Sequence, residues 1–503
     1  MIVPGETLWL TLIGLPTASA LAGAFVRPGL AERIARAASL VTLVAALLLL
    51  VGPSRGSAGG ILGWDAMSDL FAVLVAALYA LSTWDSARYL GSVRASALSP
   101  STYYALLGGF AAAMLATLAV SDLALMWIGL EATTVVSALL VMYDRRPASV
   151  EAAWRYVLIA SGGLAVGLFA LALLYGEAGS LDAFALAAHP PAWTPALALV
   201  VALALVGFGT KVGLFPMHAW LPDAHSEAPA PVSALLSGAL LPTALYVFLR
   251  IYDLVPPTGA LGLRELVVGV GALTALVAAF LTFGQRSYKR LFAYSSMENM
   301  GIALVGIGLG GIALYGALLL LVAHAFAKSS AFACSGTALQ TTGTSRIDSV
   351  RGFGRRSPRT GALWLLSGLA VTGTPPFGSF AAELVILTGA LAQGAYGVVA
   401  ALVVTLGVAF AGVNYPLGRM VLSRAESPEL PSEATESWLS TIVPGIALGV
   451  ALAVGLGSIP YLTGALRIAA GGGFPRPGPP VGGGPSANPP GGRTRGSPTS
   501  PRT

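Results

Sequence analysis

Lysine, glutamate and histidine side chains stand inside segments that otherwise have the composition of membrane spans, and these residue types can accept and release protons. The set is Glu131, Lys211, Glu298, His324, Lys328 and Glu383. A charge at the middle of a bilayer costs at least ~2.5–3.5 kcal/mol, so such groups persist where they are paired, hydrated or used. Loss of solvent brings buried lysines and glutamates toward titration near neutral pH, and a neighbouring charge then decides which group holds the proton. This pattern favours a proton relay.

The spacing of these residues places two of them together, and their role could also be static pairing. His324 and Lys328 are four residues apart, which places them on the same face of a helix. The alternative to a relay is static pairing, for example of Glu131 with Lys211, that only holds helices together. Apolar packing would hold a bundle at lower cost than buried ion pairs do, so we favour the relay.

The composition excludes a soluble protein. The chain has 503 residues, of which 55% are hydrophobic and 10% charged, with a net charge of +6. Soluble domains carry about 25% charged residues. The single cysteine, Cys334, excludes an internal disulfide and an iron–sulfur cluster held by four thiolates. We expect no catalytic residue, no metal and no redox cofactor in this chain, and no nucleic-acid partner.

The elements that position these residues are predicted to be membrane-spanning helices, because each apolar segment approaches the ~20 residues that cross a bilayer. We predict an all-α polytopic protein with about fourteen spans. The spans begin near residues 7, 36, 66, 104, 122, 154, 193, 228, 261, 290, 311, 361, 397 and 439. Lys and Arg concentrate in the loops that follow odd-numbered spans, and Lys289 is counted among them. The loops on the other side hold few basic residues, and Arg250 is counted there. The positive-inside rule then predicts a multi-pass protein of the inner (cytoplasmic) membrane with its N-terminus outside.

Two of the spans are interrupted by glycine and proline. Pro216 follows Lys211 together with Gly213, and Pro375 precedes Glu383 in TGTPPFGSF. Broken helices leave backbone groups unpaired, which is tolerated only in protein or water-lined cavities. Interruptions at corresponding places in two halves indicate an inverted-repeat transporter, with helices 7 and 12 broken.

This pattern divides the chain into five predicted parts. They are helices 1–3 in residues 1–103, a first inverted repeat of five helices in 104–252, a second in 261–425, helix 14 in 439–465, and a disordered tail in 471–503. The tail is too rich in Gly and Pro to fold.

Two motifs resemble ligand sites and are interpreted otherwise. Gly306 to Gly311 formally fits G-x-G-x-x-G, but no strand precedes it, so we expect no nucleotide site. His218, Asp223, His225 and Glu227 lie on a Pro-rich loop without a histidine pair four residues apart, so we expect loop bonding or capping of the next helix, by Asp223 or Ser226, rather than a metal.

Three stretches, TKVGLFPMHAWLPDAHSEAPAPVSALLSG, LFAYSSMENMG and AHAFAKSSAF, resemble the proton-translocating antiporter-like membrane subunits. That family includes the large membrane subunits of respiratory complex I, the Mrp-type cation/proton antiporters and the membrane arms of group 4 hydrogenases. WIGLEATTVVSALLV, SALLSG and PPFGSFAAE resemble most the component F type of hydrogenase 4. The resemblance covers about residues 60 to 425 and implies a fourteen-helix core with two inverted five-helix repeats.

The resemblance also implies roles for single residues. Glu131 is similar to the glutamate of helix 5, Lys211 to the broken-helix lysine that pairs with it, and Lys328 to the central lysine with His324 beside it. Glu383 is similar to the acid that ends the series. Arg155 stands where relatives often have lysine. The sequence departs from the pattern at Ser237, where complex I relatives have histidine, and at Asn299, where many hydrogenase relatives do, so water would have to bridge there.

The function implied is that of a proton-translocating subunit of a redox-driven complex, with Glu298 in the relay and Arg155, His218, Pro216, Pro375 and Ser237 in support. Its partners would be other antiporter-like membrane subunits, a soluble nickel–iron or iron–sulfur oxidoreductase arm and the lipid bilayer. The alternative is an Mrp-type or stand-alone cation/proton antiporter.

Overall fold

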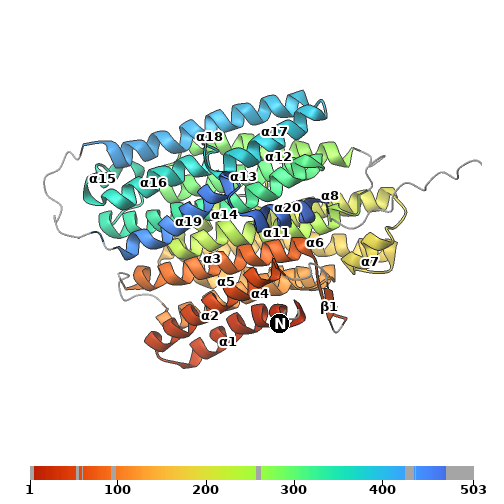
Figure 1. The fold of residues 1–503 in the computed structure, drawn as a ribbon, viewed down its shortest axis with the longest axis horizontal. Coiled ribbons are helices and arrows are strands. Elements are labelled where there is room, and N and C mark those ends of the chain that lie inside the picture. The colour runs from red at the N-terminus through yellow and green to blue at the C-terminus, as the bar shows by residue number, and fades with distance from the viewer. Residues whose placement is uncertain are drawn as a thin grey trace, which may run out of the picture.

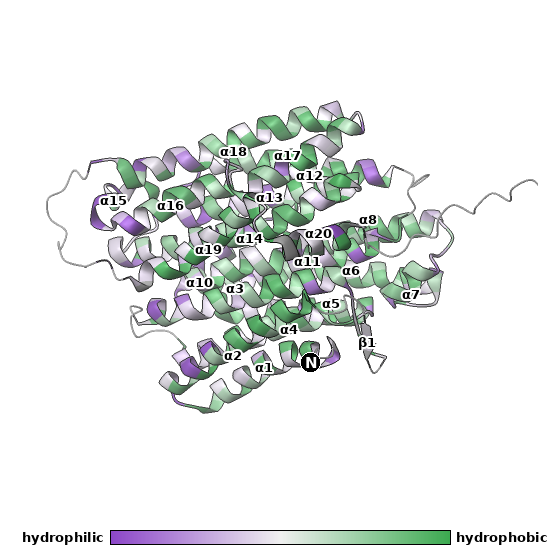
Figure 2. Cartoon of the chain, viewed as in Figure 1, coloured by the Kyte–Doolittle hydropathy of each residue, from purple (hydrophilic) through white to green (hydrophobic). Residues whose placement is uncertain are grey.

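The chain folds into a bundle of helices that run roughly along one direction (Figure 1). The computed structural model describes residues 5–51, 56–58, 60–91, 98–255, 262–424, 436 and 438–471. Apart from residue 471, the predicted tail of residues 471–503 lies outside these residues. Hydrophobic positions cover most of the helix lengths, and hydrophilic segments gather near helix ends, as at α15 (Phe353–Arg356) (Figure 2).

The helices of the N-terminal half account for spans one to eight. Their bounds are α1 (Gly5–Phe25), α2 (Pro28–Leu49), α3 (Ala66–Leu90), α4 (Pro100–Leu118), α5 (Leu123–Val141), α6 (Pro147–Ala178), α8 (Pro195–Val212), α10 (Ala230–Leu235) and α11 (Leu241–Tyr252). Between α10 and α11 lies a π-helical segment, η1 (Leu236–Leu240). Two short helices, α7 (Ala183–Ala188) and α9 (Leu221–Glu227), and a hairpin of β1 (Gly56–Ala58) with β2 (Leu62–Trp64) were not predicted.

The helices of the C-terminal half account for the remaining spans. Their bounds are α12 (Leu263–Thr282), α13 (Tyr288–Leu309), α14 (Ile312–Thr342), α16 (Pro358–Val371), α17 (Gly378–Ala392), α18 (Tyr396–Leu422) and α19 (Leu439–Gly455). A 3-10 turn, η2 (Ile347–Ser349), precedes α15. The predicted helix of residues 439–465 is divided, since α19 ends at Gly455 and α20 (Pro460–Gly471) begins after a turn.

Length and apolar composition support the membrane assignment. Within the described residues, ten helices are long and apolar enough to cross a bilayer, and Gly378–Ala392 and Ser440–Gly455 are shorter apolar helices. The prediction of an all-α membrane protein with about fourteen spans is confirmed. The assignment of the two halves to inverted repeats stays a prediction.

Local sequence explains where many helices begin. Asp65, Ser99, Asp122, Asp182 and Thr194 each accept a hydrogen bond from a backbone N–H in the first turn of the helix that follows. Such side chains satisfy N–H groups that have no partner within the helix. Proline in the first turn also favours the start of a helix, because its missing N–H is not needed there. This is the case in α2, α4, α6 and α8.

Both predicted helix breaks are present. After Lys211, α8 ends and Gly213 takes the left-handed conformation, with φ of 84°. The second break separates α16 from α17 and contains Gly373 with φ of 63°. Glycine adopts positive φ without the steric cost that a side chain would bring.

At the centre of the bundle lies α14, which packs against α13, α17, α19, α16, α10 and α3. It therefore connects the two halves, and two of its titratable residues, His324 and Lys328, are fully buried.

Candidate functional site

Lys211 is fully buried at the C-terminal end of α8 and is held by two hydroxyl groups. Its Nζ donates to Thr134 Oγ1 at 2.6 Å and to Tyr156 Oη at 2.6 Å. It also lies 4.7 Å from the centre of the Tyr156 ring. Because the break ends α8 one residue later, the partial negative charge of the helix C-terminus also favours the ammonium.

Glu131 approaches this lysine only through a hydroxyl. Thr134 Oγ1 donates to Glu131 Oε2 at 3.4 Å, and Ser161 donates to the other carboxylate oxygen at 2.5 Å. Among the described residues, no direct ion pair joins Glu131 to Lys211, and the pairing of the two that the resemblance implies stays a prediction. The two charges face each other across Thr134.

Small residues bring α6 and α8 close enough to build this arrangement. A Cβ at Gly163 would lie 2.4 Å from Thr210 Cβ, and one at Gly207 would lie 2.4 Å from the backbone of Gly167. Small residues at helix contacts let backbones approach closely in membranes. Larger side chains there would push Lys211 away from Tyr156.

An aromatic series leads from this group toward the C-terminal half. The Tyr156 ring lies 4.5 Å from that of Trp220, whose Nε1 donates to Thr210 O at 2.7 Å. The next ring is that of His225, 6.2 Å from Trp220 and 6.0 Å from Phe332 on α14. His225 is fully buried, and its Nδ1 lies 2.9 Å from Leu221 O. The residue set aside as a metal ligand therefore stands between the two halves.

Lys328 is fully buried and has a carbonyl oxygen as partner. Its Nζ donates to Phe292 O at 2.6 Å. The same oxygen accepts from Ser296 Oγ at 2.9 Å, and Ser296 Oγ lies 2.7 Å from Ser237 Oγ. Ser237 Oγ in turn lies 3.4 Å from His324 Nε2. Two hydroxyls thus connect the histidine to the acceptor of the lysine.

The π-helical segment η1 positions Ser237. A π-bulge inserts an extra residue into a helix and often occurs at functional sites. The next residue, Gly238, packs tightly, since a Cβ there would lie 2.6 Å from Leu78 Cδ1 and 3.1 Å from Ala325 O. This close approach presses the hydroxyl of Ser237 against α13 and α14. Ser237 makes direct hydroxyl contacts there, and the predicted bridging water stays a prediction.

Glu298 and Asn299 form a separate polar contact on α13. Asn299 Nδ2 donates to Glu298 Oε2 at 2.7 Å, to Ser295 O at 2.9 Å and to Val371 O at 3.3 Å. Val371 is the last residue of α16, so this amide connects the buried acid to the second helix break.

Glu383 lies at that break, against Gly373. A Cβ at Gly373 would lie 1.8 Å from Glu383 Oε2, so a glycine is needed there to seat the carboxylate. The acid borders a cavity of about 210 Å³ between α17 and α18, which Thr372, Phe410 and other residues line. Glu383 is only 3% exposed.

The predicted supporting residues other than Ser237 do not touch these groups. Arg155 is half-exposed and pairs with Asp223 and Glu151, each at 2.6 Å. His218 is half-buried between the rings of Phe215 and Tyr294. Pro216 and Pro375 are exposed within the two breaks. These residues shape and anchor the breaks.

The segment between α8 and α10 makes bonds without capping α10. Asp223 also pairs with Arg290 at 3.0 Å, and Ser226 Oγ donates to the backbone oxygen of Asp223. The N-cap of α10 is Pro229, without a side-chain cap, so the predicted capping by Asp223 or Ser226 is wrong.

Two cations counted with the loops are buried in helices. Lys289 lies in α13 and donates to Ser226 O at 2.8 Å and to Ala228 O. Arg250 is fully buried in α11 and pairs with Asp65 at 2.5 Å. Both residues were predicted to lie in loops because each is within about one turn of a helix end.

The other functional contacts that the sequence did not suggest are made by hydroxyl groups. Thr134, Tyr156, Ser161 and Ser296 escaped notice because neutral polar residues are common in apolar helices. One signal was available, since Thr134 follows Glu131 by three residues and so shares its helix face.

A family model described as NADH:quinone oxidoreductase/Mrp antiporter, TM, matches residues 120–409. The chain belongs to this family. The hydrogenase-4 component F homolog of Methylacidiphilum infernorum is 35% identical over 376 residues, which cover 71% of this chain and 77% of that relative. Subunit N of the NADH-quinone oxidoreductase of Desulforudis audaxviator is 32% identical over 309 residues, and the match covers 60% of this chain and 62% of that subunit. The resemblance inferred from the motifs is confirmed.

Three solved structures share the fold of this chain. A chain of an archaeal membrane-bound sulfane sulfur reductase matches with a TM-score of 0.84 at 24% identity, covering 93% of this chain and 98% of that one. A chain of the Mrp complex from Dietzia sp. gives 0.81 at 21% identity, covering 93% and 98%. A chain of complex I from Thermus thermophilus gives 0.74 at 24% identity, covering 90% and 98%. This protein is therefore a multi-pass, antiporter-like membrane subunit of the same architecture.

Proposed function

We propose that this chain moves protons across the cytoplasmic membrane as a subunit of a larger redox-driven complex. The observation that carries the proposal is the environment of the two central lysines. Lys211 and Lys328 are fully buried, and the described residues give them only hydroxyl and carbonyl partners. A buried ammonium that makes no direct ion pair is costly to keep charged, so it is poorly suited to a purely structural role and well suited to losing its proton.

In the first half, Lys211 is the central group. An ammonium has three donors, and Thr134 and Tyr156 accept two of them. Loss of the Lys211 proton removes one positive charge and one donor to the Thr134 oxygen, and so changes the strength of the hydrogen bond from Thr134 to Glu131. The protonation of Lys211 and the charge of Glu131 are thereby coupled.

In the second half, the hydroxyls of Ser237 and Ser296 form the connection between His324 and the oxygen that Lys328 binds. A hydroxyl is both donor and acceptor, so this pair can reverse its hydrogen bonds when His324 changes protonation. The Phe292 oxygen only accepts, so the serines couple His324 to Lys328 by reorienting and pass no proton through the carbonyl. His225 lies between this group and Lys211 and can exchange a proton itself. Glu298 and Glu383 continue the series toward the second break.

The energy scale of the coupling is modest. Moving one charge across a membrane potential of 100 mV takes ~2.3 kcal/mol. Shifting the pKa of a group by one unit takes ~1.36 kcal/mol, so a few neighbouring shifts of this size are sufficient.

The proposed partners are other antiporter-like membrane subunits and a soluble nickel–iron or iron–sulfur oxidoreductase arm. Electron transfer is assigned to that arm, and this chain is assigned no redox cofactor. The name of the relative from Methylacidiphilum infernorum, a hydrogenase-4 component, supports such an arm. The arginine-rich loops support an N-terminus outside the cytoplasm.

The test is proton transport by the complex in membrane vesicles, followed with a pH-sensitive dye, in Lys211→Ala and Lys328→Ala variants. We expect each variant to assemble and to lose transport. Arg419→Ala, an exposed residue at the end of α18, is the control. Transport at the unaltered rate in both lysine variants would refute the proposal. Mass spectrometry of the proteins retained in mild detergent separates this function from a stand-alone antiporter, which would retain no oxidoreductase subunits.

A further inference from the structure

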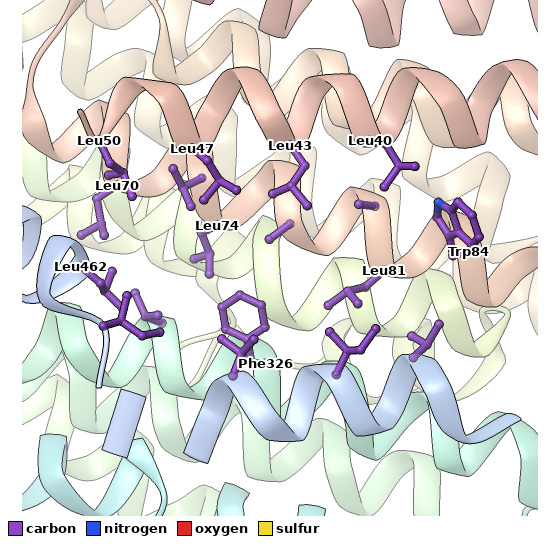
Figure 3. Close-up of a pocket in the computed structure, with 18 of the residues that line it drawn as sticks. Leu40, Leu43, Leu47, Leu50, Leu70, Leu74, Leu81, Trp84, Phe326 and Leu462 are labelled. Atoms are coloured by element: carbon purple, nitrogen blue, oxygen red, sulfur yellow. The ribbon is translucent and has the colours of Figure 1, made fainter. Parts of the chain in front are cut away.

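An open apolar groove lies on the bundle beside α14, and none of its lining residues is charged. Its volume is about 580 Å³, and α2, α3, α14, α19 and α20 contribute to its walls. Figure 3 shows Leu40, Leu43 and Leu47 of α2 on one side, with Leu74 of α3 and Phe326 of α14 forming the floor. The lining consists entirely of apolar side chains and tryptophan, so it is suited to hydrocarbon.

The lining of the groove is unlike a contact made for a partner helix. Along α2 the groove extends from Leu40 to Leu50, or about 15 Å at 1.5 Å per residue. Helix contacts in membranes favour small residues, whereas leucine, valine and isoleucine dominate this lining.

A single lipid chain fits the same length. One leaflet accounts for half of the ~30 Å hydrocarbon core, or ~15 Å. The groove is open at its edges, since Leu40, Leu47 and Ile446 are 43%, 47% and 54% exposed, so a chain could enter sideways from the bilayer.

A guanidinium group lies at one end of the groove. Arg36 lies one turn before Leu40 on α2, and its guanidinium carbon is 5.1 Å from the centre of the Trp84 ring, which lines that end. Glu32 accepts from one terminal nitrogen at 2.9 Å. A guanidinium has five N–H donors in a planar fork that suits phosphate, so donors remain available.

We propose that this groove binds one acyl chain of an anionic phospholipid, whose phosphate lies against Arg36. The bound chain fills the space between α2 and α19 and so joins the N-terminal helices to the C-terminal ones. Arg36 selects the headgroup, and the leucine-lined walls hold the chain. The proposal is independent of the proposed proton transport.

The probe is phosphatidylglycerol with a photoactivatable acyl chain, placed in phosphatidylcholine nanodiscs with the full-length protein. We expect labelled peptides from α2, α3 and α14. Ala77→Phe, which fills the groove, should lower labelling about tenfold, because a packed site excludes the chain. Arg36→Gln should lower labelling by phosphatidylglycerol and leave labelling by the matching phosphatidylcholine probe unchanged.

The control variants carry the same kinds of substitution at positions next to the groove. Ala37→Phe and Arg33→Gln alter exposed residues of α2 that do not line it, and both should label like the unaltered protein. Labelling spread evenly over the bundle, or unaffected by Ala77→Phe, would overturn the proposal. If that variant fails to fold, competition on the unaltered protein decides. Unlabelled phosphatidylglycerol should displace the probe, and equal displacement by phosphatidylcholine would contradict the proposal.

Discussion

Lys211 and Glu131 face each other across the hydroxyl of Thr134 rather than forming an ion pair. The Lys211 Nζ lies 2.6 Å from Thr134 Oγ1, which lies 3.4 Å from Glu131 Oε2. A bridging hydroxyl keeps the charges coupled but separable, so either can change protonation without breaking a direct salt bridge. This geometry leads to the first prediction.

Replacement of Thr134 by valine should uncouple the two charges. The side chain keeps its shape but loses the hydroxyl, and a hydrogen bond to a charged group contributes ~1.5–3 kcal/mol. We expect proton transport in vesicles to fall by at least about tenfold, since ~1.4 kcal/mol corresponds to a factor of ten. Thr133→Val removes a neighbouring hydroxyl that binds only Leu130 O and should have little effect. Equal transport in the two variants would show that the bridge is not used.

The Ser237 hydroxyl is predicted to connect His324 to the lysine of the second half. Ser237→Ala should slow transport while the complex still assembles, because the contact to Ser296 at 2.7 Å is lost. Ser335→Ala on α14 is the matched control, since that buried hydroxyl binds only the carbonyl of Ala331. If Ser237→Ala transports as fast as this control, the hydroxyl connection is not part of the path.

Gly373 is predicted to seat the carboxylate of Glu383. Gly373→Ala should displace the carboxylate, because the new Cβ would fall 1.8 Å from its Oε2. Backbone strain at positive φ also arises, so Gly394→Ala serves as control, with φ of 69° and nothing within 4 Å of its Cβ. We expect transport to fall only in Gly373→Ala. Similar losses in both variants would assign the effect to backbone strain.

The buried pair of Asp65 and Arg250 is predicted to make stability depend on pH. Burial acts to raise the pKa of Asp65, but attraction to Arg250 and hydrogen bonds from Arg250 and Ser68 outweigh it, so the pKa is lowered from 3.8. Because the folded pKa is below the unfolded one, the stabilisation is complete above the unfolded value and is lost as the pH falls through the folded value. Removing one partner of a buried pair costs ~3–5 kcal/mol.

Thermal unfolding of the purified protein measures this dependence. The Tm of Asp65→Asn should lie below that of the unaltered protein by a constant amount above about pH 5, and the difference should shrink below about pH 4. Asp348→Asn, at an exposed residue whose ion-pair distance is 4.0 Å, should change neither value. A difference in Tm that is the same at acidic and neutral pH would contradict the assignment.

The sequence predicted the architecture well because the free energies that determine it are large. Continuous apolar segments predict membrane helices, and glycine and proline near Lys211 and Glu383 predicted both breaks. Buried charges in apolar segments are rare enough to mark the site without a structure.

The contacts of those charges could not be predicted, because they depend on side chains brought together from different helices. Tyr156 reaches Lys211 only through the close packing of α6 on α8, and Ser237 reaches Ser296 through a π-helical turn. The burial of Arg250 and Lys289 was missed for a different reason. Helix ends are uncertain by one turn from sequence, and one turn separates a loop cation from a buried one.

The most direct test of the central claim is proton transport by a variant in which the first charge pair is neutralised, Glu131→Gln with Lys211→Met. If these residues carry protons, the double variant should assemble and transport none. If they only balance each other's charge, removing both should restore the packing and the transport that Lys211→Ala loses. Recovery of transport in the double variant would contradict the account.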